Sequence, residues 1–87
     1  MKIKSGFFIK NINGQHVVCA ESSSDAPRNN IVLTEASLFL WRKLEEGEMT
    51  KEQLLHALLD NFEISTVLAL SNIDVFVKTL RENGIIE

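Results

Sequence analysis

Length, composition and charge exclude several kinds of protein. The chain has 87 residues, 45% of them hydrophobic, which suffices for one core, so we expect residues 1–87 to form a single domain. The formal net charge is −3 and the 9 lysines and arginines are spread along the chain, whereas nucleic-acid binding draws on a clustered basic surface. The single cysteine, Cys19, excludes an internal disulfide and fits a reducing compartment.

The N-terminal residues indicate a cytoplasmic protein. Residues 1–6 carry lysines, but no apolar run of signal-peptide length follows them. No other stretch is both long and apolar enough to cross a bilayer. We therefore expect a soluble, cytoplasmic chain without membrane contact.

The first third of the chain predicts a β-hairpin. Two β-prone runs, residues 6–12 and 15–21, flank Asn13-Gly14, and this pair favours a type I′ turn because both of its central positions need positive φ. The turn sets the register, in which the expected partners are Ile12 with Gln15, Lys10 with Val17, Ile9 with Val18, and Phe7 with Ala20.

Directly opposed residues share a face of the hairpin. We assign one face to the core, the one that carries Phe7, Ile9, Val18 and Ala20. The opposite face is more apolar than a fully solvated face needs to be, because Phe8, Val17 and Cys19 lie there beside Lys10.

A polar segment then separates the hairpin from a short third strand. Residues 22–30 lack a large apolar anchor, which predicts a mobile loop. The β-branched run at residues 31–33 is long enough for a strand and too short for a helix.

The remainder of the chain predicts three helices. Thr34, Thr50 and Ser65 are the expected N-caps, and Thr50 with Gln53 matches a capping box. Gly47 and Gly84 are the expected stops of the first and third helices. The expected helices span about 35–46, 51–62 and 66–83, and an apolar tail, Ile85-Ile86, follows them.

The order β-β-β-α-α-α predicts an α+β fold. We expect a winged helix-turn-helix in which an N-terminal three-stranded antiparallel β-sheet is followed by three α-helices. Within this fold we assign Trp41 to the core, between Leu40 and the other apolar residues of the first helix, in preference to a peptide-contacting role.

With this order of elements, the chain resembles the PqqD-like proteins, also called RiPP recognition elements. The likeness covers nearly the whole chain and rests on the order and spacing of its segments. These are Gly6-Phe7-Phe8-Ile9, Ile31-Val32-Leu33-Thr34-Glu35, Phe39-Leu40-Trp41, Thr50-Lys51-Glu52-Gln53-Leu54 and the tail from Phe76 to Ile86.

The resemblance implies a function. In such proteins the leader segment of a ribosomally made precursor peptide lies as an extra antiparallel strand on the edge of the third strand, packed against the third helix. A separate enzyme, such as a radical-SAM maturase, a cyclase or a leader peptidase, then modifies the peptide. The resemblance thus implies a non-catalytic adaptor that needs no cofactor.

On this basis we expect the peptide to contact both the third strand and the third helix. The predicted peptide-binding residues are Asn30, Ile31, Val32, Leu33, Val67, Leu70, Asp74, Lys78 and Arg81. Lys78 and Arg81 are assigned to acidic residues of the leader.

The sequence departs from the family early in the third helix. Several positions that are polar in the family are Val67, Leu70 and Val75 here. One interpretation is that Val67 and Leu70 extend the core. The other is that they line the peptide groove or the face of a homodimer.

The chain offers no arrangement typical of catalysis or metal binding. His16 and Cys19 are three apart in a strand and so lie on opposite faces, and His56 is isolated on a helix. We therefore expect no metal, no cofactor and no enzymatic activity.

Two other functions stay open from the sequence. A winged-helix DNA-binding regulator needs basic and amide side chains on the third helix, but its first half is apolar here. A subunit that only docks onto a partner enzyme is the third alternative.

Overall fold

The computed structural model describes residues 1–22 and 30–86. Three strands come first, β1 (Phe7–Ile12), β2 (Gln15–Ala20) and β3 (Val32–Leu33). Three helices follow, α1 (Glu35–Glu46), α2 (Lys51–Asn61) and α3 (Thr66–Glu82). The expected α+β fold is confirmed. Most of the loop expected at residues 22–30 lies outside the described residues.

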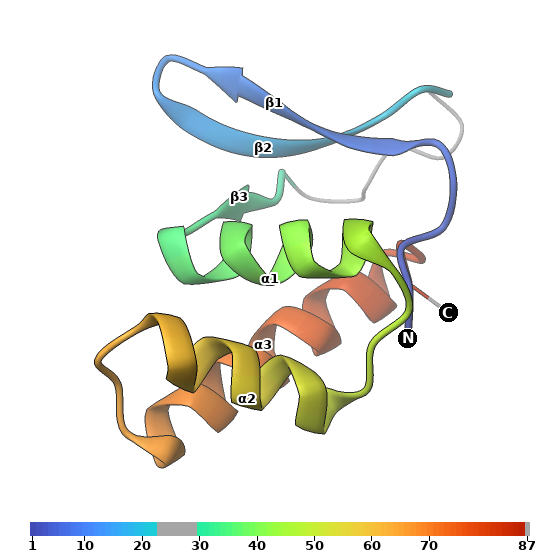
Figure 1. Cartoon of the computed structure of the whole chain (residues 1–87). Helices are drawn as coiled ribbons and strands as arrows, with labels where there is room; N and C mark the ends of the chain where they lie inside the picture. Colours follow the sequence, from blue (N-terminus) through green and yellow to red (C-terminus); the bar gives the residue numbers. More distant parts are fainter. Residues whose placement is uncertain (23–29, 87) are drawn as a thin grey trace.

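The sheet lies on one side of α1, and α2 and α3 lie on the other (Figure 1). Its strands are antiparallel in the order β1-β2-β3, so β2 is central and both β1 and β3 are edges. The hairpin has the predicted register from Phe7–Ala20 to Ile12–Gln15. Asn13 and Gly14 both have positive φ, 53° and 83°, as the type I′ turn requires.

The two faces of the sheet divide as the register predicts. Val18 is buried, and Phe7 and Ile9 pack against the core on the same face. Val17 pairs with Val32, so this valine pair shares the outer face with Phe8 and Cys19.

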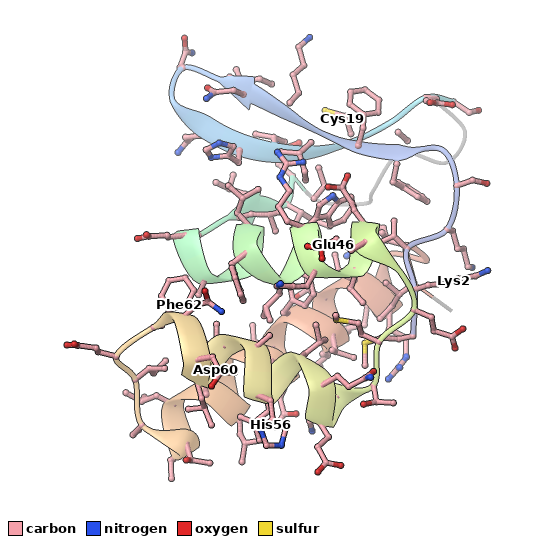
Figure 2. The ribbon with its side chains drawn as sticks, viewed as in Figure 1. Lys2, Cys19, Glu46, His56, Asp60 and Phe62 are labelled. Atoms are coloured by element: carbon pink, nitrogen blue, oxygen red, sulfur yellow. The ribbon has the colours of Figure 1, made fainter. Side chains whose placement is uncertain are left out.

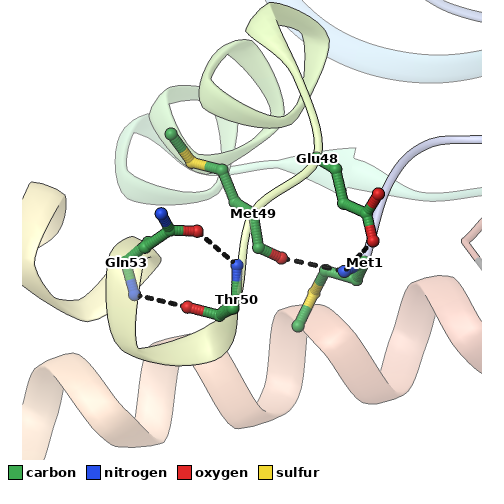
Figure 3. Close-up of polar contacts among 5 residues, drawn as sticks. All are labelled: Met1, Glu48, Met49, Thr50 and Gln53. Atoms are coloured by element: carbon green, nitrogen blue, oxygen red, sulfur yellow. Dashed lines mark hydrogen bonds and ion pairs between the residues drawn. The ribbon is translucent and has the colours of Figure 1, made fainter.

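Side-chain caps define where the helices begin. Thr34, Thr50 and Ser65 each accept a hydrogen bond from a backbone N–H three residues later. At Thr50 the predicted capping box is complete, because Gln53 Oε1 in turn accepts from the Thr50 N–H at 2.8 Å (Figure 3). The predicted helix boundaries are confirmed to within one residue of the observed ones.

The core lies between the sheet and the three helices. Its largest fully buried side chains are Trp41, Leu40, Leu54, Leu58, Ile73, Leu80 and Ile85. The assignment of Trp41 to the core is therefore confirmed. At the end of α2, the Phe62 ring packs edge-on against Phe39 of α1, with 5.3 Å between ring centroids.

The apolar tail folds back onto the core. Gly84, at φ 70°, ends α3 in a left-handed conformation, and the Ile85 N–H then donates to the Leu80 carbonyl at 2.9 Å. Ile85 and Ile86 are buried, and Ile86 forms a β-bridge with Ile3. The N-terminal segment is also tied to the start of α2, since the Met1 amino group donates to the Met49 carbonyl (Figure 3).

No helix among the described residues is long and apolar enough to span a bilayer.

Candidate functional site

The outer edge of β3 carries backbone groups that form no hydrogen bond with β2. The Val18 N–H donates to the Ile31 carbonyl at 3.0 Å, and His16 pairs with Leu33 two residues along. Bonded and non-bonded pairs alternate in an antiparallel ladder. Ile31 and Leu33 therefore direct their backbone groups toward β2. The N–H and C=O of Val32 point away from β2, to an edge with which no strand of residues 1–22 and 30–86 pairs.

A groove runs beside this edge, between β3, the start of α1 and one side of α3. Its volume is about 170 Å³. It is lined by Ile31, Val32, Leu33, Thr34, Ser37, Val75, Phe76, Thr79 and Leu80. None of these side chains is charged, so the groove suits apolar and small polar groups.

The floor and the rim of the groove differ in burial. Ile31, Leu33, Phe76 and Leu80 belong to the buried core and form a fixed floor. Val32 and Val75 lie at the rim and are 47% and 64% exposed. Two exposed valines across an uncharged groove leave apolar surface that a bound chain would bury.

Thr34 and Ser37 close the end of the groove at the start of α1. Thr34 Oγ1 accepts a hydrogen bond from the Ser37 N–H at 3.2 Å, and its hydroxyl donates to Ser37 Oγ at 3.1 Å. The groove is therefore built on a capped helix end, which fixes the position of β3 relative to α1.

The structure brings only part of the predicted site together. Ile31, Val32 and Leu33 line the groove, and Asn30 is the exposed residue that precedes them. The predicted residues of α3 lie elsewhere on the helix and do not line the groove: Val67, Leu70, Asp74, Lys78 and Arg81.

The expectation that Val67 extends the core is wrong, because Val67 is 77% exposed. Leu70 is only partly buried. Leu68, 58% exposed, lies seven residues before Val75 and hence about 20° away around the helix axis, whereas Val67 is about 80° away. The exposed apolar side chains on the groove side of α3 are thus Leu68 and Val75.

Asp74, Lys78 and Arg81 lie around a second hollow. They line it with Met1, Lys51, Val77 and Glu82, and its volume is about 450 Å³. Asp74 forms an ion pair with Lys51 of α2. The groove and the hollow have no lining residue in common.

The sequence analysis did not assign five of the lining residues to the site, namely Thr34, Ser37, Phe76, Thr79 and Leu80, and it named Val75 only as a departure from the family. The i, i+4 spacing of Val75 and Thr79 shows that they share a side of α3. Nothing in the sequence, however, states which side of the helix faces the sheet edge.

The side chains that could carry chemistry do not line the groove, although His16 pairs with the groove residue Leu33 in the sheet. Cys19 lies on the outer face of the hairpin and His56 on α2, with α1 between these elements (Figure 2). Among residues 1–22 and 30–86, no three His, Cys, Asp or Glu side chains converge in a way that would hold a metal ion.

The fold is similar to two solved structures, both with a leader peptide in their descriptions. One is described as TbiB1 in complex with the TbiA(beta) leader peptide, with 18% sequence identity and a TM-score of 0.74 over 100% of this chain and 95% of that chain. The other is a lasso peptide synthetase B1 complexed with the leader peptide, at 17% identity and a TM-score of 0.70 over 97% and 93% of the two chains. No curated protein matches the chain.

The sequence itself carries a family signature. The profile of the family described as coenzyme PQQ synthesis protein D (PqqD) matches residues 15–86, a span that includes β2, β3 and all three helices. The chain therefore belongs to the PqqD family.

Proposed function

We propose that this protein is a non-catalytic adaptor that binds the leader segment of a ribosomally synthesised precursor peptide by β-strand addition. The observation that carries the proposal is the edge of β3 at Val32, which no described strand covers and which lies beside an uncharged groove whose floor belongs to the core. Membership of the PqqD family and the leader peptides in the two similar structures support it.

Strand geometry predicts how the peptide would lie. A peptide residue opposite Val32 would exchange two backbone hydrogen bonds with it and direct its side chain to the outer face of the sheet. The residues before and after it would lie opposite Ile31 and Leu33 and direct their side chains into the groove. The peptide should therefore carry two apolar or small residues separated by one position.

The adaptor would present the rest of the peptide to a separate modifying enzyme, such as a radical-SAM maturase, a cyclase or a leader peptidase. The adaptor itself would need no cofactor and would act in the cytoplasm, where precursor peptides are made. A homodimer is compatible with this role provided that the edge of β3 stays open.

The sharpest test changes the edge and leaves the ladder with β2 intact. In Val32→Pro the proline removes an N–H that β2 does not use, and an edge strand tolerates proline for this reason. The variant loses the hydrogen bond from this N–H to the peptide, which is worth about 1 kcal/mol. We therefore expect peptide affinity to fall about fivefold or more. The measurement is titration with a synthetic leader peptide whose sequence carries two apolar residues separated by one position.

Val32→Thr is the matched control, since threonine keeps the N–H and the β-branched shape. It should bind the peptide about as well as the wild type does. Urea denaturation of both variants verifies that they are folded. If folded Val32→Pro binds the leader as tightly as Val32→Thr, the peptide does not pair with β3 and the proposal is wrong.

A further inference from the structure

We propose that the hollow between the start of α2 and the C-terminal half of α3 is a second binding site, which takes an acidic segment with an apolar side chain from the peptide-modifying enzyme. This inference rests on the proposed function for the identity of the partner. Its physical basis is independent of the groove, because it depends on the charges and the apolar floor of the hollow.

The charges of the hollow favour a carboxylate ligand. Lys51, Lys78 and Arg81 line it together with two acids, Asp74 and Glu82. Lys51 and Asp74 form an ion pair across the gap between α2 and α3. Counted over these side chains, the hollow has one net positive charge, although the whole chain has a net charge of −3.

Two of the cations are available to a ligand. Within residues 1–22 and 30–86, neither Lys78 nor Arg81 has an acidic partner within 4.0 Å. They are three residues apart on α3, where like charges repel each other, so a carboxylate between them would relieve that repulsion. Arg81 also offers the planar donor pair that binds a carboxylate through two parallel hydrogen bonds.

The floor of the hollow is apolar. Val77 is only 8% exposed and lies between the charged positions of α3, and the partly buried Met1 adds a flexible thioether side chain. A cationic rim over an apolar floor matches a segment in which one apolar side chain is flanked by acidic residues. A free inorganic anion would leave the floor unused.

The position of the hollow indicates the modifying enzyme as the source of this segment. Val75 and Thr79 face the groove, whereas Lys78 and Arg81 line the hollow, on another side of the same helix. A peptide paired with β3 would therefore leave the hollow open. An adaptor that presents a peptide must hold the enzyme through a surface that the peptide does not cover.

A purely structural role gives a different expectation. Arg81 lies in the last turn of α3, where a cation stabilises the helix dipole, and Lys78 would then be an ordinary solvated lysine. In that case neutralising them changes stability slightly and changes no binding. A binding measurement therefore separates the two roles.

The test uses a defined probe, a blocked pentapeptide of sequence Glu-Glu-Leu-Glu-Glu, titrated into the ¹⁵N-labelled protein at low ionic strength. We expect the amide signals of residue 51 and of residues 77–82 to shift, and those of residues 31–33 to stay in place. Lys78→Gln with Arg81→Gln should weaken this binding about fivefold or more, because both charged contacts are lost.

Two controls make the result specific. Lys10→Gln removes one exposed positive charge from the hairpin, outside the hollow, and should leave the affinity for the acidic pentapeptide within about twofold of the wild type. Lys78→Gln alone removes one charge from the hollow and should weaken this affinity more than Lys10→Gln does. The matching Lys-Lys-Leu-Lys-Lys peptide should give no shifts. Equal shifts from both peptides, shifts confined to the groove, or unchanged affinity in the double variant would each overturn the second site.

The same titration, repeated with the leader peptide already bound, separates this inference from the proposed function. Unchanged binding of the acidic probe to the loaded protein supports two independent sites. Competition between the leader and the probe would mean one shared surface and would overturn the second site. Failure of the leader to bind at all, with the probe still bound, would instead count against the proposed function alone.

Discussion

Val67 and Val75 show how much depends on single positions of α3. Both are exposed valines in the same helix, 77% and 64% exposed, but only Val75 lines the groove. From the sequence, both were candidates for the apolar surface of this helix. The helical period fixes which residues share a side, but the rotation of α3 about its axis is set by Ile73, Phe76 and Leu80 packing against distant elements.

This pair provides a matched test of the groove wall. Val75→Gln should weaken leader binding about fivefold or more, because a polar amide replaces apolar surface that the peptide would bury. Val67→Gln makes the same chemical change outside the groove and should leave affinity within about twofold. Isothermal titration calorimetry with the leader peptide measures both.

Each exposed valine contributes little to the packing of the fold, so both variants should unfold within about 0.5 kcal/mol of the wild type. The wall assignment fails if Val67→Gln reduces leader affinity as much as Val75→Gln does. It also fails if neither variant affects it.

At the scale of the elements, local chemistry explains why the helices were predictable. Each N-cap is a hydroxyl residue that acts on an N–H three residues away, so the signal lies within a few positions of the chain. The hairpin register likewise follows from Asn13-Gly14 alone. The groove was less predictable, since it joins β3 to α3 across more than forty positions and no local pattern records that contact.

The capping box of α2 gives a prediction at this scale. Thr50→Ala removes the oxygen that accepts from the Gln53 N–H at 3.1 Å and should cost about 1 kcal/mol of unfolding free energy. Urea denaturation measures the loss. Leader affinity should not change, because Thr50 does not line the groove.

Thr66→Ala is the control for the loss of a threonine hydroxyl. Thr66 is the exposed first residue of α3 and follows the cap Ser65, so its loss should change stability by at most about 0.5 kcal/mol. Equal destabilisation by the two substitutions would mean that the capping box contributes nothing specific.

At the scale of the whole molecule, the distribution of charge argues against the DNA-binding alternative. The net charge is −3, and the two most apolar exposed side chains in the first half of α3, Val67 and Leu68, cannot read base edges through hydrogen bonds. The fold class alone would have allowed either function, because three helices beside a small sheet serve both.

A gel-shift experiment at about 50 mM salt tests this directly, since even non-specific DNA binding is strong at low salt. We expect no retardation of a duplex by the protein at micromolar concentration. Retardation that disappears as the salt concentration rises would show a basic surface that the described residues do not reveal, and the regulator hypothesis would return.

The bridge between Ile3 and Ile86, with the Lys4 N–H donating to the Ile85 carbonyl at 2.8 Å, places the first and last strand-like segments side by side (Figure 1). A domain whose two end segments lie next to each other can be inserted into a surface loop of a larger polypeptide without distorting the domain or the loop. The same geometry would permit the domain to be inserted into a surface loop of an enzyme, because its two joining segments already lie next to each other.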